Sequence, residues 1–139
     1  MELEEGKNTG VEQGKLRTIK VMVVDDSATI RRTAEDLLTS EGFAVFTSDD
    51  GFQALAKMVD SHPDIVFMDV GMPRLNGYQA CSVIKNSRLF RKTPVIMLSS
   101  KDGLFDKARG RLVGAEQFIS KPFTRKDLLE SIRRYVPLS

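Results

Sequence analysis

The segment from Asp64 to Asp69, Asp-Ile-Val-Phe-Met-Asp, constrains the fold more than any other part of the sequence. Its four consecutive apolar residues predict a strand that is buried on both faces, as in a parallel sheet. Pro73 and Gly77 follow closely, and residues of these two types end strands. The segment therefore predicts a central strand that carries Asp69 to its C-terminal end. In open α/β sheets, ligands bind at that edge.

Four further short apolar runs predict strands, and a helical pattern follows each of the five strands. The expected strands are 20–24, 43–47, 64–69, 94–98 and 117–119. The expected helices are one that ends at Gly42, one that opens at Asp50, 78–85, 104–113, and one that opens with a capping box from Thr124 to Asp127. The helix residues expected to face the sheet are Ile30, Ala34, Leu37, Leu38, Leu55, Met58, Val59, Ala80, Val83, Ile84, Leu128, Leu129, Ile132 and Val136.

This alternation predicts an α/β fold, a five-stranded doubly wound parallel sheet of strand order 2-1-3-4-5 with five helices. The chain has 139 residues, which suits one domain. We expect residues 20–139 to form that domain, and the polar residues 1–19 to form a disordered tail. Neither a signal segment nor an apolar span is present, and the single cysteine excludes an internal disulfide. These features predict a cytoplasmic protein without membrane insertion.

Polar residues stand at four of the predicted strand ends: Asp25 with Asp26, Asp69, Ser99 and Lys121. The C-terminal ends of parallel strands share one edge, so these side chains should converge. Three carboxylates that close together cannot all stay ionised without a cation. Their oxygens suit Mg²⁺, and the absence of His and Cys argues against Zn²⁺.

A metal held by carboxylates, with a lysine and a hydroxyl nearby, is suited to phosphoryl transfer. Asp69 lies centrally and can attack phosphorus to form an acyl phosphate. Asp26 and Asp25 would hold the metal, Asp25 directly or through a water molecule, and the Gly71 carbonyl is a further candidate ligand. The Lys121 ammonium group would offer a positive charge to the phosphoryl oxygens, and the Ser99 hydroxyl would form a hydrogen bond with the phosphoryl group.

Four motifs in this order resemble the response regulator receiver domains of the CheY-like family. They are Val24-Asp25-Asp26-Ser27, Met68-Asp69 with Met72-Pro73 and Asn76-Gly77, Leu98-Ser99-Ser100-Lys101, and Lys121-Pro122-Phe123. The resemblance covers residues 20–137. It implies phosphorylation of Asp69 by a sensor histidine kinase, a switch through Ser99 and Phe118, and a cis peptide between Lys121 and Pro122.

Three longer segments, 27–35, 72–79 and 94–107, resemble a narrower group, the stand-alone response regulators of type IV pilus twitching motility. This likeness implies control of pilus extension or surface motility. A chemotaxis-type receiver with another output is the alternative within the family.

Three residues depart from the common pattern of the family. Gly71 replaces a larger side chain, and Lys101 stands where an acidic or amide residue often orients water. Neither can act as a base at neutral pH, so we expect slower hydrolysis of the acyl phosphate. Phe118 stands where many relatives have tyrosine, and it lacks the hydroxyl that would fix one rotamer.

The residues from Lys101 onward include nine Lys and Arg against five Asp and Glu, which suits an acidic protein target on the face from Leu104 to Tyr135. No helix-turn-helix follows, so direct DNA binding is not expected. The chain is expected to be a phospho-acceptor that assists its own phosphorylation and dephosphorylation, rather than an enzyme.

Three alternatives outside that reading remain open. A small aspartate-nucleophile phosphohydrolase commonly has an acid at the position of Gly71 and a cap domain. A flavin carrier would place phosphate against Asp25 and Asp26, which would repel it. An unphosphorylated interaction module would keep the acidic cluster without using it.

Overall fold

The computed structural model describes residues 17–101 and 103–137. Residues 1–16, most of the expected tail, lie outside the described residues. Ile19, which the sequence analysis also assigned to the tail, is only 7% exposed and packs in the core. Nearby, Arg17 forms an ion pair with Asp64 at 2.9 Å and donates a hydrogen bond to the Pro137 carbonyl. The packed part of the chain therefore includes residues before Lys20.

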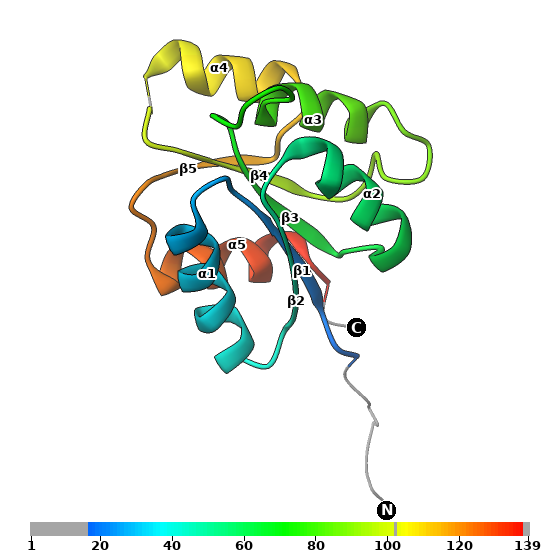
Figure 1. The fold of residues 1–139 in the computed structure, drawn as a ribbon, viewed down its shortest axis with the longest axis vertical. Helices are drawn as coiled ribbons and strands as arrows, with labels where there is room; N and C mark the ends of the chain where they lie inside the picture. Colours follow the sequence, from blue (N-terminus) through cyan, green and yellow to red (C-terminus); the bar gives the residue numbers. More distant parts are fainter. Residues whose placement is uncertain (1–16, 102, 138–139) are drawn as a thin grey trace, which may run out of the picture.

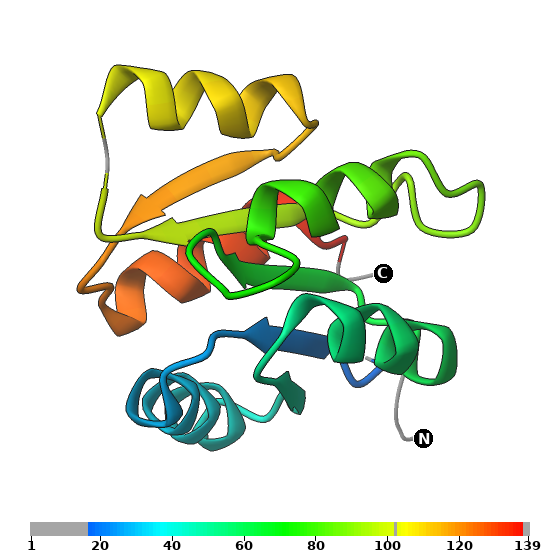
Figure 2. The same ribbon diagram turned by 45° about the horizontal axis from the view of Figure 1, so that its top comes forward.

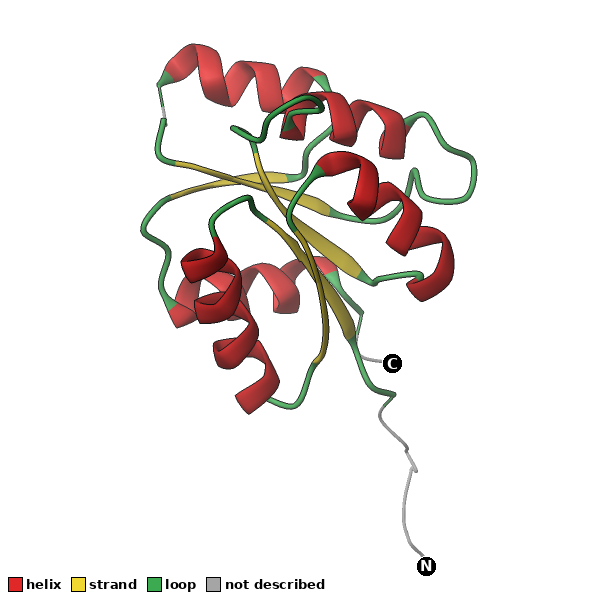
Figure 3. Cartoon of the chain, viewed as in Figure 1, coloured by secondary structure: helices red, strands yellow, loops and turns green. Residues whose placement is uncertain are grey.

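Five parallel strands form one sheet in the order β2-β1-β3-β4-β5, as predicted (Figures 1 and 3). The strands are β1 Lys20–Val24, β2 Ala44–Ser48, β3 Ile65–Asp69, β4 Val95–Ser99 and β5 Gln117–Ser120. The predicted strand boundaries are correct to within one residue. All five residues of β3 and of β4 are buried, because helices cover both faces of the sheet.

The helices lie in two layers, one on each side of the sheet (Figure 2). The helices are α1 Ala28–Ser40, α2 Gly51–Ser61, α3 Gly77–Lys85, α4 Leu104–Leu112 and α5 Arg125–Tyr135. One layer contains α1 and α5, and the other contains α2, α3 and α4. Within the described residues, no helix combines the length and the apolar composition that crossing a membrane requires.

Most of the helix residues predicted to face the sheet are buried or half-buried, but two predictions are wrong. Val59 is 57% exposed and Val83 is 50% exposed. Val59 follows Met58 on α2, and Val83 precedes Ile84 on α3; Met58 and Ile84 are both buried. One residue along a helix turns the side chain by about 100°, so a narrow buried stripe leaves these neighbours in solvent.

The loop after β3 folds back tightly so that α3 begins beside the end of that strand. The Gly77 N–H donates to the Val70 carbonyl at 3.1 Å, and Asn76 and Gln79 close a capping box. A Cβ atom on Gly77 would overlap the backbone oxygen of Asp69 and lie 2.8 Å from the Val70 Cα. This close backbone approach requires glycine.

We expect Gly77→Ala to destabilise the fold by about 2–4 kcal/mol, because the added methyl group collides with backbone atoms that cannot move cheaply. Chemical denaturation measures this loss. The matched control is Gly71→Ala, whose Cβ would meet no atom closer than 3.9 Å. If both variants unfold at the same denaturant concentration, the close approach at Gly77 does not constrain the fold.

Candidate functional site

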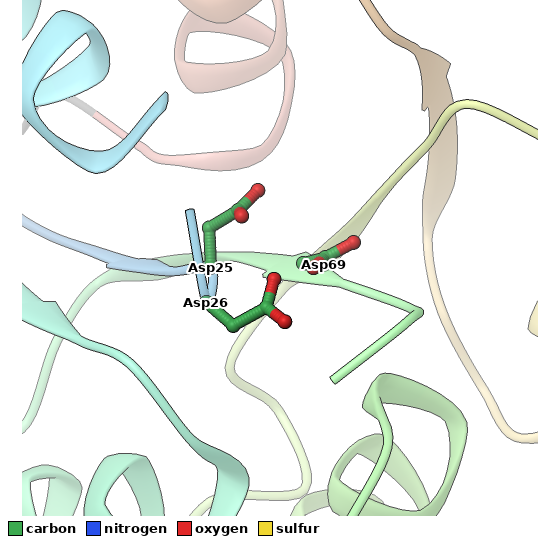
Figure 4. Close-up of side chains that lie close together, drawn as sticks. All are labelled: Asp25, Asp26 and Asp69. Carbon is green, nitrogen blue, oxygen red and sulfur yellow. The ribbon is translucent and has the colours of Figure 1, made fainter. Parts of the chain in front are cut away.

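The C-terminal edge of the sheet brings together polar residues from four strands. Asp25 and Asp26 follow β1, Asp69 ends β3, Ser99 ends β4, and Lys121 follows β5. One carboxylate oxygen from each of the three aspartates lies within 4.8 Å of the other two. Figure 4 shows the Asp26 side chain reaching toward Asp69 from the end of β1. The convergence predicted from the strand ends is therefore present.

Lys121 links two of these carboxylates. Its Nζ lies 2.6 Å from Asp25 Oδ2 and 3.1 Å from Asp69 Oδ1. Burial alone would lower the pKa of Lys121. The hydrogen bond to Asp25 and the charges of Asp69 and Asp25 outweigh burial, so the pKa is raised. Lys121 therefore stays charged at neutral pH. The peptide bond that follows it, to Pro122, is cis, as the family resemblance implied.

Asp25 is fully buried, and both of its carboxylate oxygens have partners. Oδ1 accepts a hydrogen bond from the Ser27 N–H at 2.9 Å, and Oδ2 accepts from Lys121. The Asp25 carbonyl also accepts from Arg31 at 2.7 Å. Asp25 is thus fixed by the protein itself, which leaves the oxygens of Asp26 and Asp69 as the more accessible ligands.

The site fits a divalent cation. Three carboxylates face a single ammonium group, which leaves an excess of negative charge. Partial burial raises the pKa of Asp26, and the neighbouring charges of Asp69 and Asp25 raise it further. The grouped donors are all oxygens, the ligands that Mg²⁺ prefers. The family resemblance implies a Mg²⁺ ion at this place, and the three carboxylates suit that ion. The Gly71 N–H donates a hydrogen bond to Asp69 Oδ1 at 3.2 Å. The metal-ligand role expected of the Gly71 carbonyl stays a prediction.

Beside Asp69 lies a cavity of about 360 Å³, bounded by the β3–α3 loop, the end of β4 and one side of α4. Ser99 and Lys101 line it, and the Ser99 Oγ accepts the Lys101 N–H at 2.9 Å. Gly71 also lines it, so neither position 71 nor 101 presents an acid or amide beside Asp69. Slower hydrolysis therefore stays a prediction.

Phe118 lies apart from this cavity. It is half-buried on β5, next to Gly110 of α4, and lines a separate groove of about 300 Å³. Phe118 is not among the residues that line the cavity beside Asp69. Its predicted role in the switch stays a prediction.

The sequence analysis missed two residues of the cavity wall, Tyr78 and Arg109. The Arg109 guanidinium lies 4.3 Å from the centre of the Tyr78 ring, and the Tyr78 hydroxyl donates to the Asp106 carbonyl at 3.2 Å. Tyr78 was assigned only to the start of a helix. No pattern in the sequence pairs Tyr78 with Arg109, which is 31 residues away.

Comparisons with known proteins agree with this geometry. The family model "Response regulator receiver domain" matches residues 21–133. Protein PilG of Pseudomonas aeruginosa is 61% identical over 119 residues, which cover 86% of this chain and 88% of PilG.

Solved structures show the same fold. Chemotaxis protein CheY4 of Vibrio cholerae has a TM-score of 0.82 and 32% identity, over 86% of this chain and all of CheY4. The receiver domain of a sensor histidine kinase from Pseudomonas aeruginosa has a TM-score of 0.79 and 27% identity, over 86% and 98% of the two chains. That structure has a magnesium ion coordinated in its active-site cleft. On the strength of the family model and of these relatives, the chain belongs to the response regulator receiver domain family.

Proposed function

We propose that this chain is a single-domain response regulator of a two-component system, in which a sensor histidine kinase phosphorylates Asp69. One observation carries the proposal: Asp69 lies at the strand edge with Asp25, Asp26 and a charged Lys121. Asp69 is 6% exposed, yet it borders an open cavity through which a donor can reach it.

The proposed reaction is an in-line transfer. An oxygen of the Asp69 carboxylate attacks phosphorus, the bond from phosphorus to the histidine nitrogen breaks, and an acyl phosphate forms. Lys121 would keep its ammonium group beside the phosphoryl oxygens, and the Ser99 hydroxyl would bind one of them. Asp26 and Asp69 would hold Mg²⁺, with Asp25 and the Gly71 carbonyl as further ligands. When bound, the ion supplies positive charge that offsets the repulsion between carboxylates and phosphoryl group.

In this proposal the chain is a phospho-acceptor that assists its own chemistry and has no separate substrate to turn over. We place it in the cytoplasm, where a kinase would meet it.

We propose that the output surface lies between Leu104 and Tyr135. On α4, Leu104, Phe105 and Leu112 are 84%, 90% and 86% exposed, which is unusual for large apolar side chains. The adjoining groove is lined by three basic residues, Lys107, Arg111 and Arg134, against one acid, Glu116, and also by Phe118. Apolar surface beside positive charge suits a protein partner that carries apolar and acidic side chains.

We further propose that this output controls type IV pilus twitching motility. The support is the 61% identity to PilG over most of both chains, together with the three matching segments of the sequence. The alternative is a chemotaxis-type receiver with a different target, which the likeness to CheY4 keeps open.

Incubation with acetyl phosphate and Mg²⁺ should add the mass of one phosphoryl group to the wild-type chain. Asp69→Asn should abolish the addition, because an amide oxygen is a poor nucleophile and its phosphorylated product is unstable. Intact-mass spectrometry measures both. An unmodified wild-type chain would favour the unphosphorylated interaction module, and a modified Asp69→Asn chain would move the acceptor to another residue.

Mg²⁺ should raise the melting temperature of the wild-type chain, since an ion that binds only the folded state stabilises it. Asp26→Asn should raise the melting temperature without Mg²⁺ and shrink the Mg²⁺ effect, because it removes one of three clustered charges. The folded-state pKa of Asp26 is raised, so ionised Asp26 disfavours folding above that pKa, and the penalty vanishes below the unfolded-state pKa.

The matched control for this experiment is Asp36→Asn, which removes an exposed carboxylate from α1. Differential scanning calorimetry with Mg²⁺ or EDTA measures both variants. Equal Mg²⁺ responses in wild type and Asp26→Asn would place the ion elsewhere.

In a Pseudomonas aeruginosa strain that lacks PilG, the wild-type chain should restore twitching zones, and Asp69→Asn should not. The measurement is colony expansion beneath agar, with immunoblots to show equal expression. A chain that is expressed and phosphorylated but leaves twitching unrestored would contradict pilus control and favour another output.

A further inference from the structure

Helix α4 has fewer buried residues than any other helix of the structure. Its one buried residue is Gly110, and its N-cap, Gly103, provides no side-chain hydrogen bond. By contrast, α5 has a capping box and buries Leu128, Ser131 and Ile132. Figure 2 shows α4 at the edge of the molecule, above β5. Since burial contributes little, the position of α4 depends on a small number of specific contacts.

Tyr78 of α3 makes two of those contacts on one face of α4. Its hydroxyl donates to the Asp106 carbonyl at 3.2 Å, and its ring lies under the Arg109 guanidinium at 4.3 Å. Gly110 lies on the same side of α4: a Cβ added there would lie 3.9 Å from the Tyr78 ring and 3.5 Å from the Phe118 ring. Residues 106, 109 and 110 share a face because they are three and four positions apart.

Tyr78 is itself held firmly. It is 5% exposed in the first turn of α3, where Gly77 packs against the Asp69 backbone and the Asn76 capping box fixes the helix start. Burial raises the pKa of Tyr78, and the charge of Asp106 raises it further. The hydroxyl therefore stays protonated and able to donate at neutral pH. A rigid donor beside Asp69 thus reaches a weakly anchored helix.

We propose that Tyr78 is a positioning residue that holds α4 in the unphosphorylated state, and that a phosphoryl group on Asp69 weakens this hold. In this chain Tyr78 supplies the anchoring hydroxyl that Phe118 lacks. The coupling to Asp69 rests on the proposed function, whereas the contact with α4 does not.

The shared cavity gives the physical link. Asp69, Tyr78, Asp106 and Arg109 all line it. A phosphoryl group adds negative charge there, which attracts the Arg109 guanidinium away from the Tyr78 ring and repels the Asp106 carboxylate. Both effects act on the two residues through which Tyr78 holds α4. Because coupling between two equilibria is reciprocal, a weaker hold must also favour binding of the phosphoryl group.

The test compares two tyrosines of the full chain. Tyr78→Phe removes the bond to Asp106 and keeps the ring beneath Arg109. Amide hydrogen exchange in α4 should become about five-fold faster, as expected for the loss of one hydrogen bond, with exchange in β1 and β3 unchanged. Beryllofluoride, a stable mimic of the phosphoryl group, should bind more tightly with Mg²⁺ in calorimetry, by up to the same factor.

The matched control is Tyr135→Phe. The Tyr135 hydroxyl also donates to a backbone carbonyl, that of Glu116 at 3.1 Å, and its ring also lies near an arginine, Arg134 at 5.4 Å. Neither α4 exchange nor beryllofluoride affinity should change in this variant.

Each result decides a separate point. Equal α4 exchange in the two variants would overturn the positioning role. Faster exchange in Tyr78→Phe with unchanged beryllofluoride affinity would overturn the coupling and leave a purely structural contact. If beryllofluoride binds neither wild type nor variant, the proposed phosphorylation site fails, and the exchange data alone still decide whether Tyr78 holds α4.

Discussion

The site depends on the balance between three carboxylates and one ammonium group at a single sheet edge. Lys121, which follows the edge strand β5, bridges Asp25 and Asp69. Breaking a buried pair by removing one partner typically costs about 3–5 kcal/mol, because the other charge stays buried and unpaired. The ammonium group therefore keeps a cluster of like charges compatible with folding, while the remaining negative excess attracts a cation.

Two carboxylates of this cluster, those of Asp25 and Asp26, have different surroundings. Asp25 is fully buried, with both oxygens engaged by Ser27 and Lys121. Asp26 is exposed, and its pKa is raised first by partial burial and then by the charges of Asp69 and Asp25. One carboxylate is thus part of the scaffold, and the other is available to an ion from solvent.

The sequence predicted the fold and the convergence of Asp26, Asp69 and Lys121, because parallel strands must end at one edge. It could not predict that Asp25 would be sequestered by Lys121, since strand order fixes which ends are neighbours but not which side chains pair. Val59 and Val83 were placed in the core wrongly, because both are apolar and the width of the buried stripe depends on tertiary packing. Tyr78 and Arg109 were missed, as their contact joins helices 31 residues apart in a way that no periodic pattern records.

A receiver must combine a rigid reaction site with a surface that moves, and the structure separates the two by burial. Strands β3 and β4 are buried along their whole length, so Asp69 and Ser99 are fixed. Helix α4 buries only Gly110 and exposes its large apolar side chains. An element held by so little burial can have a second arrangement within a few kcal/mol of the first, and in the proposed function a phosphoryl group on Asp69 would bias the two. Gly110 places no side chain between α4 and the rings of Tyr78 and Phe118, so no α4 side chain at this position interlocks with the core.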